Sequence, residues 1–157
     1  VDAVGIGSSP VDALRRNEIE TVAYNGGTAS AARTADKTLK FYNKRAQDWW
    51  RFREALDPSQ PGGSSVTLPD DPELLSDLTS VCIKNPNTML VQGILLESKL
   101  DVKARIGRSP DKGDAVVMAY SAGLTLANQP GGKWQGRKQT PKAILGHQHQ
   151  RRKGYGQ

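Results

Sequence analysis

Two carboxylates at the start of a predicted helix are the residues of this chain best suited to chemistry. Asp111 and Asp114 lie three positions apart, so in a helix both side chains project from one side of the first turn. Carboxylate oxygens are the ligands that Mg²⁺ prefers in proteins. The spacing therefore predicts a metal-ligating edge. The alternative is that both acids only stabilise the helix through its dipole.

A third carboxylate occupies an unusual position near the beginning of the chain. Asp2 lies in residues 1–7, an apolar, glycine-containing run that is typical of a buried strand entering a turn. Parallel strands of this kind exclude charge, and open α/β sheets bind ligands at the carboxyl ends of their strands. This pattern predicts a ligand-site role for Asp2. The alternative is an acid that is merely exposed at a terminus.

Capping signals predict the elements that position these acids. Ser109 suits an N-cap and Pro110 a first helical position, so we expect a helix from residue 110 whose uncharged continuation packs inward. A helix over residues 99–106, ended by Gly107, precedes it. At the other end, Asp2 lies in a predicted strand, followed by a helix over residues 10–16 with Ser9 as N-cap and a strand over residues 19–24. This order predicts two parallel, neighbouring strands.

The middle of the chain is predicted to supply helices and an antiparallel pair. A loop over residues 25–36 precedes a helix over residues 37–56, and a short helix over residues 72–78 has Asp70 or Asp71 as its cap. Residues 81–84 and 89–98 are expected to be extended and paired. The apolar stripe of the long helix comprises Leu39, Tyr42, Ala46, Trp49, Phe52 and Leu56. Its basic side faces either solvent or a phosphate backbone and comprises Lys37, Lys40, Lys44 and Arg51.

Composition predicts a mixed α/β domain over residues 1–127 and a basic tail over residues 128–157. The chain has 157 residues and a net charge of +6, and residues 133–157 contain seven Lys or Arg and no acid. We expect a disordered tail that contacts phosphate or an acidic protein, or only improves solubility. Cys82 is the single cysteine, and no apolar run approaches the ~20 residues of a membrane span. These features predict a soluble, intracellular protein without membrane contact.

Several motifs occur in the order seen in one family of viral proteins. The opening Asp-x-x-Gly-x-Gly at residues 2–7 and Gly-Arg-Ser-Pro-Asp-x-x-Asp-Ala at residues 107–115 are the most specific of these motifs. Residues 11–14, 68–71, 77–78 and 97–99 complete the set. Over about residues 1–125 the chain resembles the C-terminal nuclease domain of phage terminase large subunits.

The resemblance implies an RNase H-like fold, with helices flanking a mixed sheet, and a metal-dependent endonuclease that cuts concatemeric viral DNA during genome packaging. Acids on different elements would hold two Mg²⁺ or Mn²⁺ ions ~4 Å apart. Asp2 matches the family's second acid, Asp114 its last, and Asp111 a neighbouring position that assists. The implied partners are double-stranded DNA, the portal protein and the small terminase subunit, in the cytoplasm of the host bacterium.

The chain departs from the family pattern at its beginning. The family's first acid lies on a strand upstream of Asp2, and the packaging ATPase lies farther upstream, so the resemblance implies a partial nuclease domain. We expect such a chain to bind divalent metal weakly and to cleave DNA poorly or not at all by itself. Glu97, at a predicted strand end, is the candidate substitute for the first acid, unless it forms an ion pair with Lys99 or a nearby arginine.

Two alternatives differ from a terminase nuclease. One is a catalytically silent fragment of the same fold that binds DNA or protein. The other is a different RNase H-like nuclease, such as a junction resolvase, which uses the same type of acid cluster on a branched substrate. Metal binding distinguishes the first alternative, and substrate preference the second.

Overall fold

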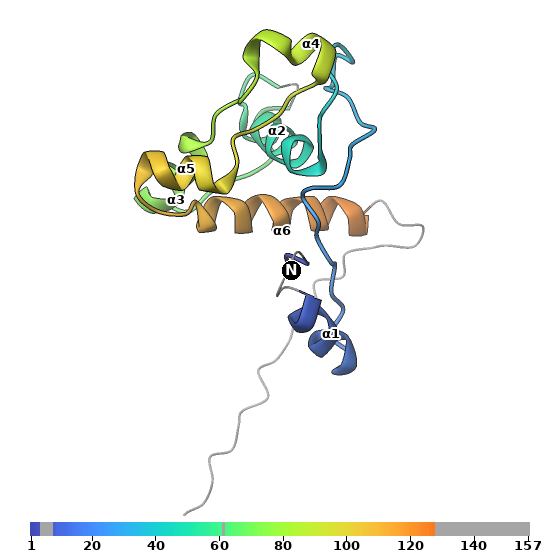
Figure 1. Ribbon diagram of the computed structural model, residues 1–157. Coiled ribbons are helices and arrows are strands. Elements are labelled where there is room, and N and C mark those ends of the chain that lie inside the picture. Colours follow the sequence, from blue (N-terminus) through green and yellow to red (C-terminus); the bar gives the residue numbers. More distant parts are fainter. Residues whose placement is uncertain (4–7, 61, 128–157) are drawn as a thin grey trace, which may run out of the picture.

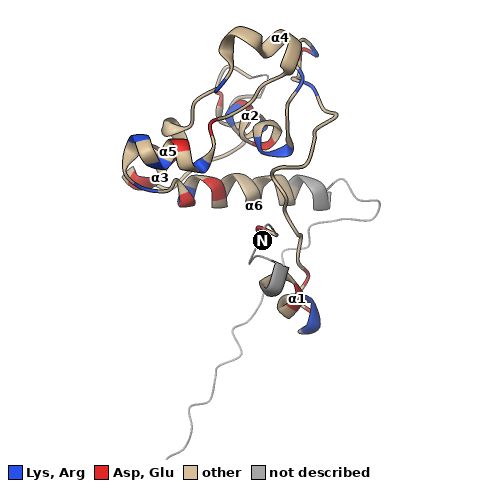
Figure 2. Ribbon diagram, in the orientation of Figure 1, with Lys and Arg blue, Asp and Glu red and all other residues tan. Residues whose placement is uncertain are grey.

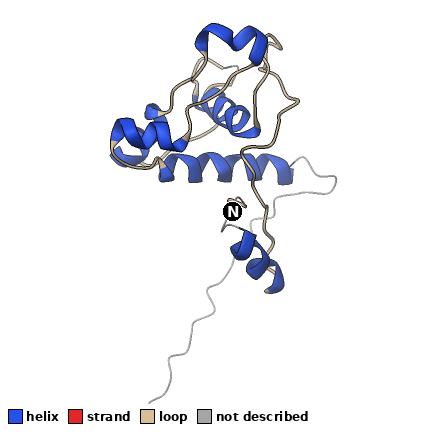
Figure 3. Ribbon diagram, in the orientation of Figure 1, coloured by secondary structure: helices blue, strands red, loops and turns tan. Residues whose placement is uncertain are grey.

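The computed structural model describes residues 1–3, 8–60 and 62–127, and helices dominate this part of the chain (Figure 3). The predicted tail at residues 128–157 lies outside the described residues. No helix in the described part is both long and apolar enough to cross a membrane. The helices are α1 (Ser8–Arg16), α2 (Lys44–Leu56), α3 (Pro72–Ser80), the 3₁₀ helix η2 (Pro86–Thr88), α4 (Met89–Gln92), α5 (Lys99–Ile106) and α6 (Asp111–Ala127).

Helix α6 is the element around which the described chain is built (Figure 1). Both α2 and α3 pack against it. Trp49 and Phe52 of α2 are buried with Val117 of α6, and the ring of Phe52 meets that of Tyr120 edge-on, 5.3 Å between centroids. The predicted inward packing of residues 115–119 is therefore confirmed for Val117 but not for Ala115 and Ala119, which are exposed, and the α2 part of the apolar stripe is confirmed.

The predicted sheet is present in the described residues only as isolated β-bridges. The parallel bridge between Asp2 and Tyr24 confirms that the first two predicted strand segments are parallel neighbours. The antiparallel bridge between Ile83 and Leu96 confirms the second predicted pair. Continuous strands are not found in residues 1–3, 8–60 and 62–127, so the flanked mixed sheet is not confirmed.

The helix predicted over residues 37–56 starts seven residues later in the structure than expected. Helix α2 starts at Lys44, where the side chain of Asn43 accepts a hydrogen bond from the Ala46 amide at 2.9 Å. Residues 40, 41 and 43 lie in β-bridges instead, because Phe41 pairs in parallel with Ile94 and both side chains are buried together with Ala46. This long-range burial outweighs the local helical pattern.

The segment predicted to be extended over residues 89–98 is also partly wrong, because residues 89–92 form α4. Helix α4 ends at Gly93, whose φ of 86° is favourable for glycine. A Cβ at this position would lie 2.8 Å from the carbonyl oxygen of Lys40. Gly93 therefore lets the chain turn back against the extended segment before α2.

The predictions for the other helices differ in accuracy. Helix α3 is capped by Asp71, whose side chain accepts hydrogen bonds from the Glu73 and Leu74 amides at 2.9 and 3.2 Å, as expected. Helix α5 has the predicted bounds and ends at Gly107. Helix α1 begins at Ser8, two residues before the predicted start, so Ser9 lies within the helix and is not its N-cap.

Candidate functional site

The first turn of α6 carries two of the predicted site residues, but it starts one residue later than expected. The carbonyl of Pro110 accepts the first helical hydrogen bond, from the Asp114 amide at 3.0 Å. The hydroxyl of Ser109 donates to the Asp111 carboxylate at 2.8 Å. Ser109 is therefore not seen to cap the helix amides, and its hydroxyl orients Asp111 instead.

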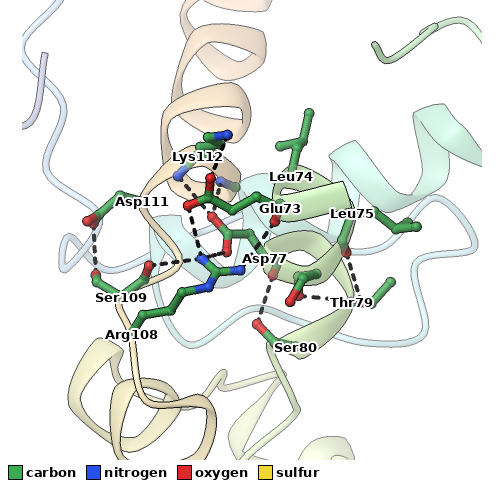
Figure 4. Close-up of polar contacts among 12 residues, drawn as sticks. Glu73, Leu74, Leu75, Asp77, Thr79, Ser80, Arg108, Ser109, Asp111 and Lys112 are labelled. Carbon is green, nitrogen blue, oxygen red and sulfur yellow. Dashed lines mark hydrogen bonds and ion pairs between the residues drawn. The ribbon is translucent and has the colours of Figure 1, made fainter. Parts of the chain in front are cut away.

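A distant carboxylate takes the capping role that was assigned to Ser109 (Figure 4). Asp77 of α3 accepts hydrogen bonds from the Lys112 and Gly113 amides at 3.0 and 3.2 Å, and its other oxygen pairs with Arg108. The sequence analysis included Asp77 in a family motif but missed its capping role. The available signal was that Asp77 shares the inward face of its helix with Leu74, three residues earlier, where an acid requires a partner.

Asp114 is buried and contacts three side chains. Its Oδ1 accepts a hydrogen bond from the Trp49 indole nitrogen at 3.1 Å and lies 3.5 Å from the Arg45 guanidinium. Its Oδ2 is paired with the Lys99 ammonium at 3.0 Å. Both oxygens of Asp114 are therefore occupied, Oδ1 by Trp49 and Arg45 and Oδ2 by Lys99.

Asp111 lies beside Asp114 but in a different environment. It is exposed, and Lys99 reaches it at 3.1 Å while also pairing with Asp114. The hydroxyl of Ser109, with Lys99, lowers the pKa of Asp111. Partial burial acts to lower the pKa of Lys99, but Asp114 and Asp111 raise it above its usual value. Lys99 therefore links the two acids as a cation.

Asp2 and Asp114 line the same cleft, which has a volume of about 410 Å³, although they come from opposite ends of the described chain. Asp111 is not among the residues that line it. Asp2 is exposed and lies in the bridge with Tyr24, whose amide donates to the Val1 carbonyl at 2.8 Å. The acids and bases that line the cleft are Asp2, Glu97, Asp114, Arg45, Lys84 and Lys99.

Glu97 forms an ion pair, as in the alternative considered for it. The Arg105 guanidinium lies 2.6 Å from its carboxylate, and the Cys82 amide donates to the same oxygen at 3.3 Å. Hydrogen bonding to Arg105 lowers the pKa of Glu97. Glu97 lines the cleft, but Arg105 already neutralises its charge.

Tyr24 joins the N-terminal segment to α2. Burial and the neighbouring carboxylate of Asp48, to which the Tyr24 hydroxyl is hydrogen-bonded, raise the pKa of Tyr24. Asp48 is buried and pairs with Lys44 at 3.1 Å, and Lys44 also reaches the Ser121 hydroxyl at 3.2 Å. Lys44 is therefore half-buried and paired within the protein, and it matches neither alternative given for the basic side of the helix.

The described residues do not form a ready-made site for two metal ions. A hard divalent cation needs several oxygen ligands at one place. In the described ranges, no three Asp, Glu, His or Cys side chains gather closely enough to form such a group. Asp2 and Asp114 nevertheless bring hard oxygen donors to one cleft, where Oδ2 of Asp114 faces the Lys99 ammonium. These donors suit a divalent cation such as Mg²⁺ or Mn²⁺, which would have to displace Lys99 from Asp114 and take its remaining ligands from water.

Comparison with known proteins identifies a structural relative. Neither the family models nor the curated protein sequences give a match. The structure is similar to a mutant nuclease domain of the large terminase subunit gp2 of bacterial virus Sf6, solved with manganese and beta-thujaplicinol. The TM-score is 0.52 at 21% sequence identity, and the match covers 74% of this chain and 61% of that domain. The likeness shows that the chain shares the fold of that nuclease domain, and the chain spans about three fifths of the relative's length.

Proposed function

We propose that this chain is a DNA-cleaving nuclease domain whose cleft binds a divalent cation between Asp2 and Asp114. One observation carries the proposal: in a fold shared with a nuclease domain, these two carboxylates from distant segments line one cleft. Such a pair supplies the oxygen ligands that Mg²⁺ and Mn²⁺ prefer. A bound cation would activate water and stabilise the leaving oxygen of a phosphodiester.

The residues around Asp114 would orient it for this task. Trp49 and Arg45 fix Oδ1, so Oδ2 is the oxygen left for a cation once the Lys99 ammonium moves aside. Arg45 and Lys99, together with Lys84 on the cleft wall, would attract the DNA backbone. Asp111 would assist from outside the cleft through its contact with Lys99.

The biological role that we propose is that of a terminase large subunit. The likeness to the Sf6 nuclease domain and the order of the sequence motifs both support cleavage of concatemeric viral DNA during packaging. Double-stranded DNA, the portal protein and the small terminase subunit would then be its partners, in the cytoplasm of the host bacterium. The two-metal mechanism of that family would need a further carboxylate beside Asp2 and Asp114.

A catalytically silent binding module is the second candidate function. It is favoured by the charge pairing of the cleft acids: Asp114 contacts Arg45 and Lys99, and Glu97 contacts Arg105. In this form the cleft would bind DNA or a protein without a cation. The two candidates therefore differ in whether the protein responds to metal.

A cleavage assay tests the nuclease proposal. Purified protein is incubated with supercoiled plasmid and either Mg²⁺ or Mn²⁺, next to Asp114→Ala, Asp2→Ala and the exposed-acid control Asp70→Ala. The proposal predicts weak, metal-dependent nicking that is lost in the first two variants and kept in the control. Nicking that persists in Asp114→Ala would contradict it, and preferential cutting of branched DNA would favour a junction resolvase.

A further inference from the structure

We propose that Asp77 is a positioning residue for Asp114, so that a side chain of α3 sets how tightly the cleft holds its cation. This inference rests on the proposed function. Asp77 does not line the cleft, and it contacts α6 on backbone atoms. Its effect on the cation would therefore pass through the first turn of α6.

The contact between Asp77 and α6 is buried and specific. The first-turn amides of a helix have no partner within the helix, and Asp77 supplies one carboxylate oxygen to the amides of Lys112 and Gly113. Its side chain is 0% exposed, and its other oxygen pairs with Arg108, which lies just before the helix. Asp77 thus fixes the two residues that immediately precede Asp114.

Gly113 makes this arrangement possible. A Cβ on Gly113 would lie 3.0 Å from the Cβ of Asp77 and 3.2 Å from the Trp49 ring. The absence of a side chain therefore lets α3 and Trp49 approach α6 at one point. The Trp49 indole then donates to Asp114 at 3.1 Å, so the same contact region holds both the backbone and the carboxylate.

Glu73, an exposed acid that pairs with Lys112, provides a matched control for Asp77. Lys112 pairs with Asp71 at 2.8 Å and with Glu73 at 2.7 Å, and Lys112 and Glu73 are exposed (Figure 4). Exposed pairs of this kind contribute little energy. Glu73→Gln should therefore leave Asp114 in place, whereas Asp77→Asn should move it, because an amide cannot accept from the two helix amides and also pair with Arg108.

The test combines an NMR signal with a metal titration. The indole N–H resonance of Trp49, assigned with a Trp49→Phe variant, reports the hydrogen bond to Asp114 without any metal or DNA. Mn²⁺ affinity is measured by calorimetry on the same proteins. We expect folded Asp77→Asn to shift the Trp49 resonance and to bind Mn²⁺ about tenfold more weakly. Glu73→Gln should match the wild type in both.

Each outcome has a defined meaning. An unchanged Trp49 resonance and unchanged Mn²⁺ affinity in folded Asp77→Asn would overturn the inference. If Asp77→Asn does not fold, Asp77→Ser takes its place, because the shorter side chain cannot reach both helix amides, and an unmoved Trp49 resonance in that variant would overturn the inference instead. A wild type that binds no Mn²⁺ would refute the proposed function, while the NMR shift would still decide whether Asp77 positions Asp114.

Discussion

The two walls of the cleft are built in different ways. On the α6 wall, Asp114 is buried and contacts Trp49, Arg45 and Lys99, and the helix turn beneath it is capped by Asp77. On the N-terminal wall, Asp2 is exposed and belongs to a short parallel bridge. Figure 1 shows the N-terminus and α1 on the other side of α6 from α2.

This difference predicts that Asp114 and Asp2 contribute differently to stability and to metal binding. Residues of both charge signs occur close together along the first turn of α6 and on the neighbouring α3 and α5 (Figure 2). A carboxylate side chain that many contacts already hold in place loses little further conformational entropy when it binds a cation. We therefore expect Asp114 to set both stability and metal affinity, and Asp2 to affect metal binding with little effect on stability.

The largest expected effect on stability comes from Asp114→Ala. The substitution leaves the Arg45 and Lys99 cations and the Trp49 indole without their shared carboxylate. Breaking a buried pair in this way costs about 3 kcal/mol of unfolding free energy. Denaturant unfolding monitored by circular dichroism measures the change. A loss below about 1 kcal/mol would place Asp114 among ordinary surface acids.

A smaller loss is expected from Gly113→Ala, and the same helix offers a control. The new Cβ would lie 3.0 Å from that of Asp77, so overpacking should destabilise the protein by about 1–3 kcal/mol. At Gly123 a Cβ meets nothing within 4 Å, so Gly123→Ala should instead stabilise α6 by up to about 1 kcal/mol. Thermal melting of both variants checks this. Equal shifts of the two melting temperatures would contradict the close approach of α3.

On the N-terminal wall, Tyr24→Phe should change the dependence of stability on alkaline pH. Because the pKa of Tyr24 is raised in the folded state, its contribution is fully present below about pH 10 and is lost as pH rises through the folded pKa. The phenylalanine variant lacks this loss. Melting temperatures measured from about pH 8 to 11 should therefore fall less steeply for the variant. Parallel curves would show that burial and Asp48 do not hold the hydroxyl neutral.

The smallest effect on stability is expected for Asp2→Ala. The residue is exposed, and substitutions at such positions usually stay within about 0.5 kcal/mol. Its unfolding midpoint should match the wild type, while its Mn²⁺ binding should be weaker. A large loss of stability would show that the N-terminal wall is held as firmly as the α6 wall.

Local signals predicted part of this structure. The caps at Asp71 and Gly107 and the inward face of α6 follow from residues close in sequence, and they were predicted. The start of α2 was predicted too early, because the local cap at Asn43 was overlooked and because the pairing of Phe41 with Ile94, far along the chain, keeps the preceding residues out of the helix. Long-range contacts of this kind override local propensity.

Local signals likewise predicted only part of the candidate site. Asp2 and Asp114 were selected from an acid in an apolar strand and an acid in a first helical turn, and both line the cleft. Asp111 was selected by the same spacing, yet it does not line the cleft. Asp77 could not be recognised as the cap of α6, because its partners, Lys112 and Gly113, are on another helix.

Titration of Mn²⁺ into the purified protein, followed by calorimetry, tests the central claim most directly. The wild type and Asp70→Ala should bind the cation weakly, with the same heat. Folded Asp114→Ala should show no binding heat above dilution. The same isotherm for Asp114→Ala and the wild type would remove Asp114 from the ligand set and contradict the account.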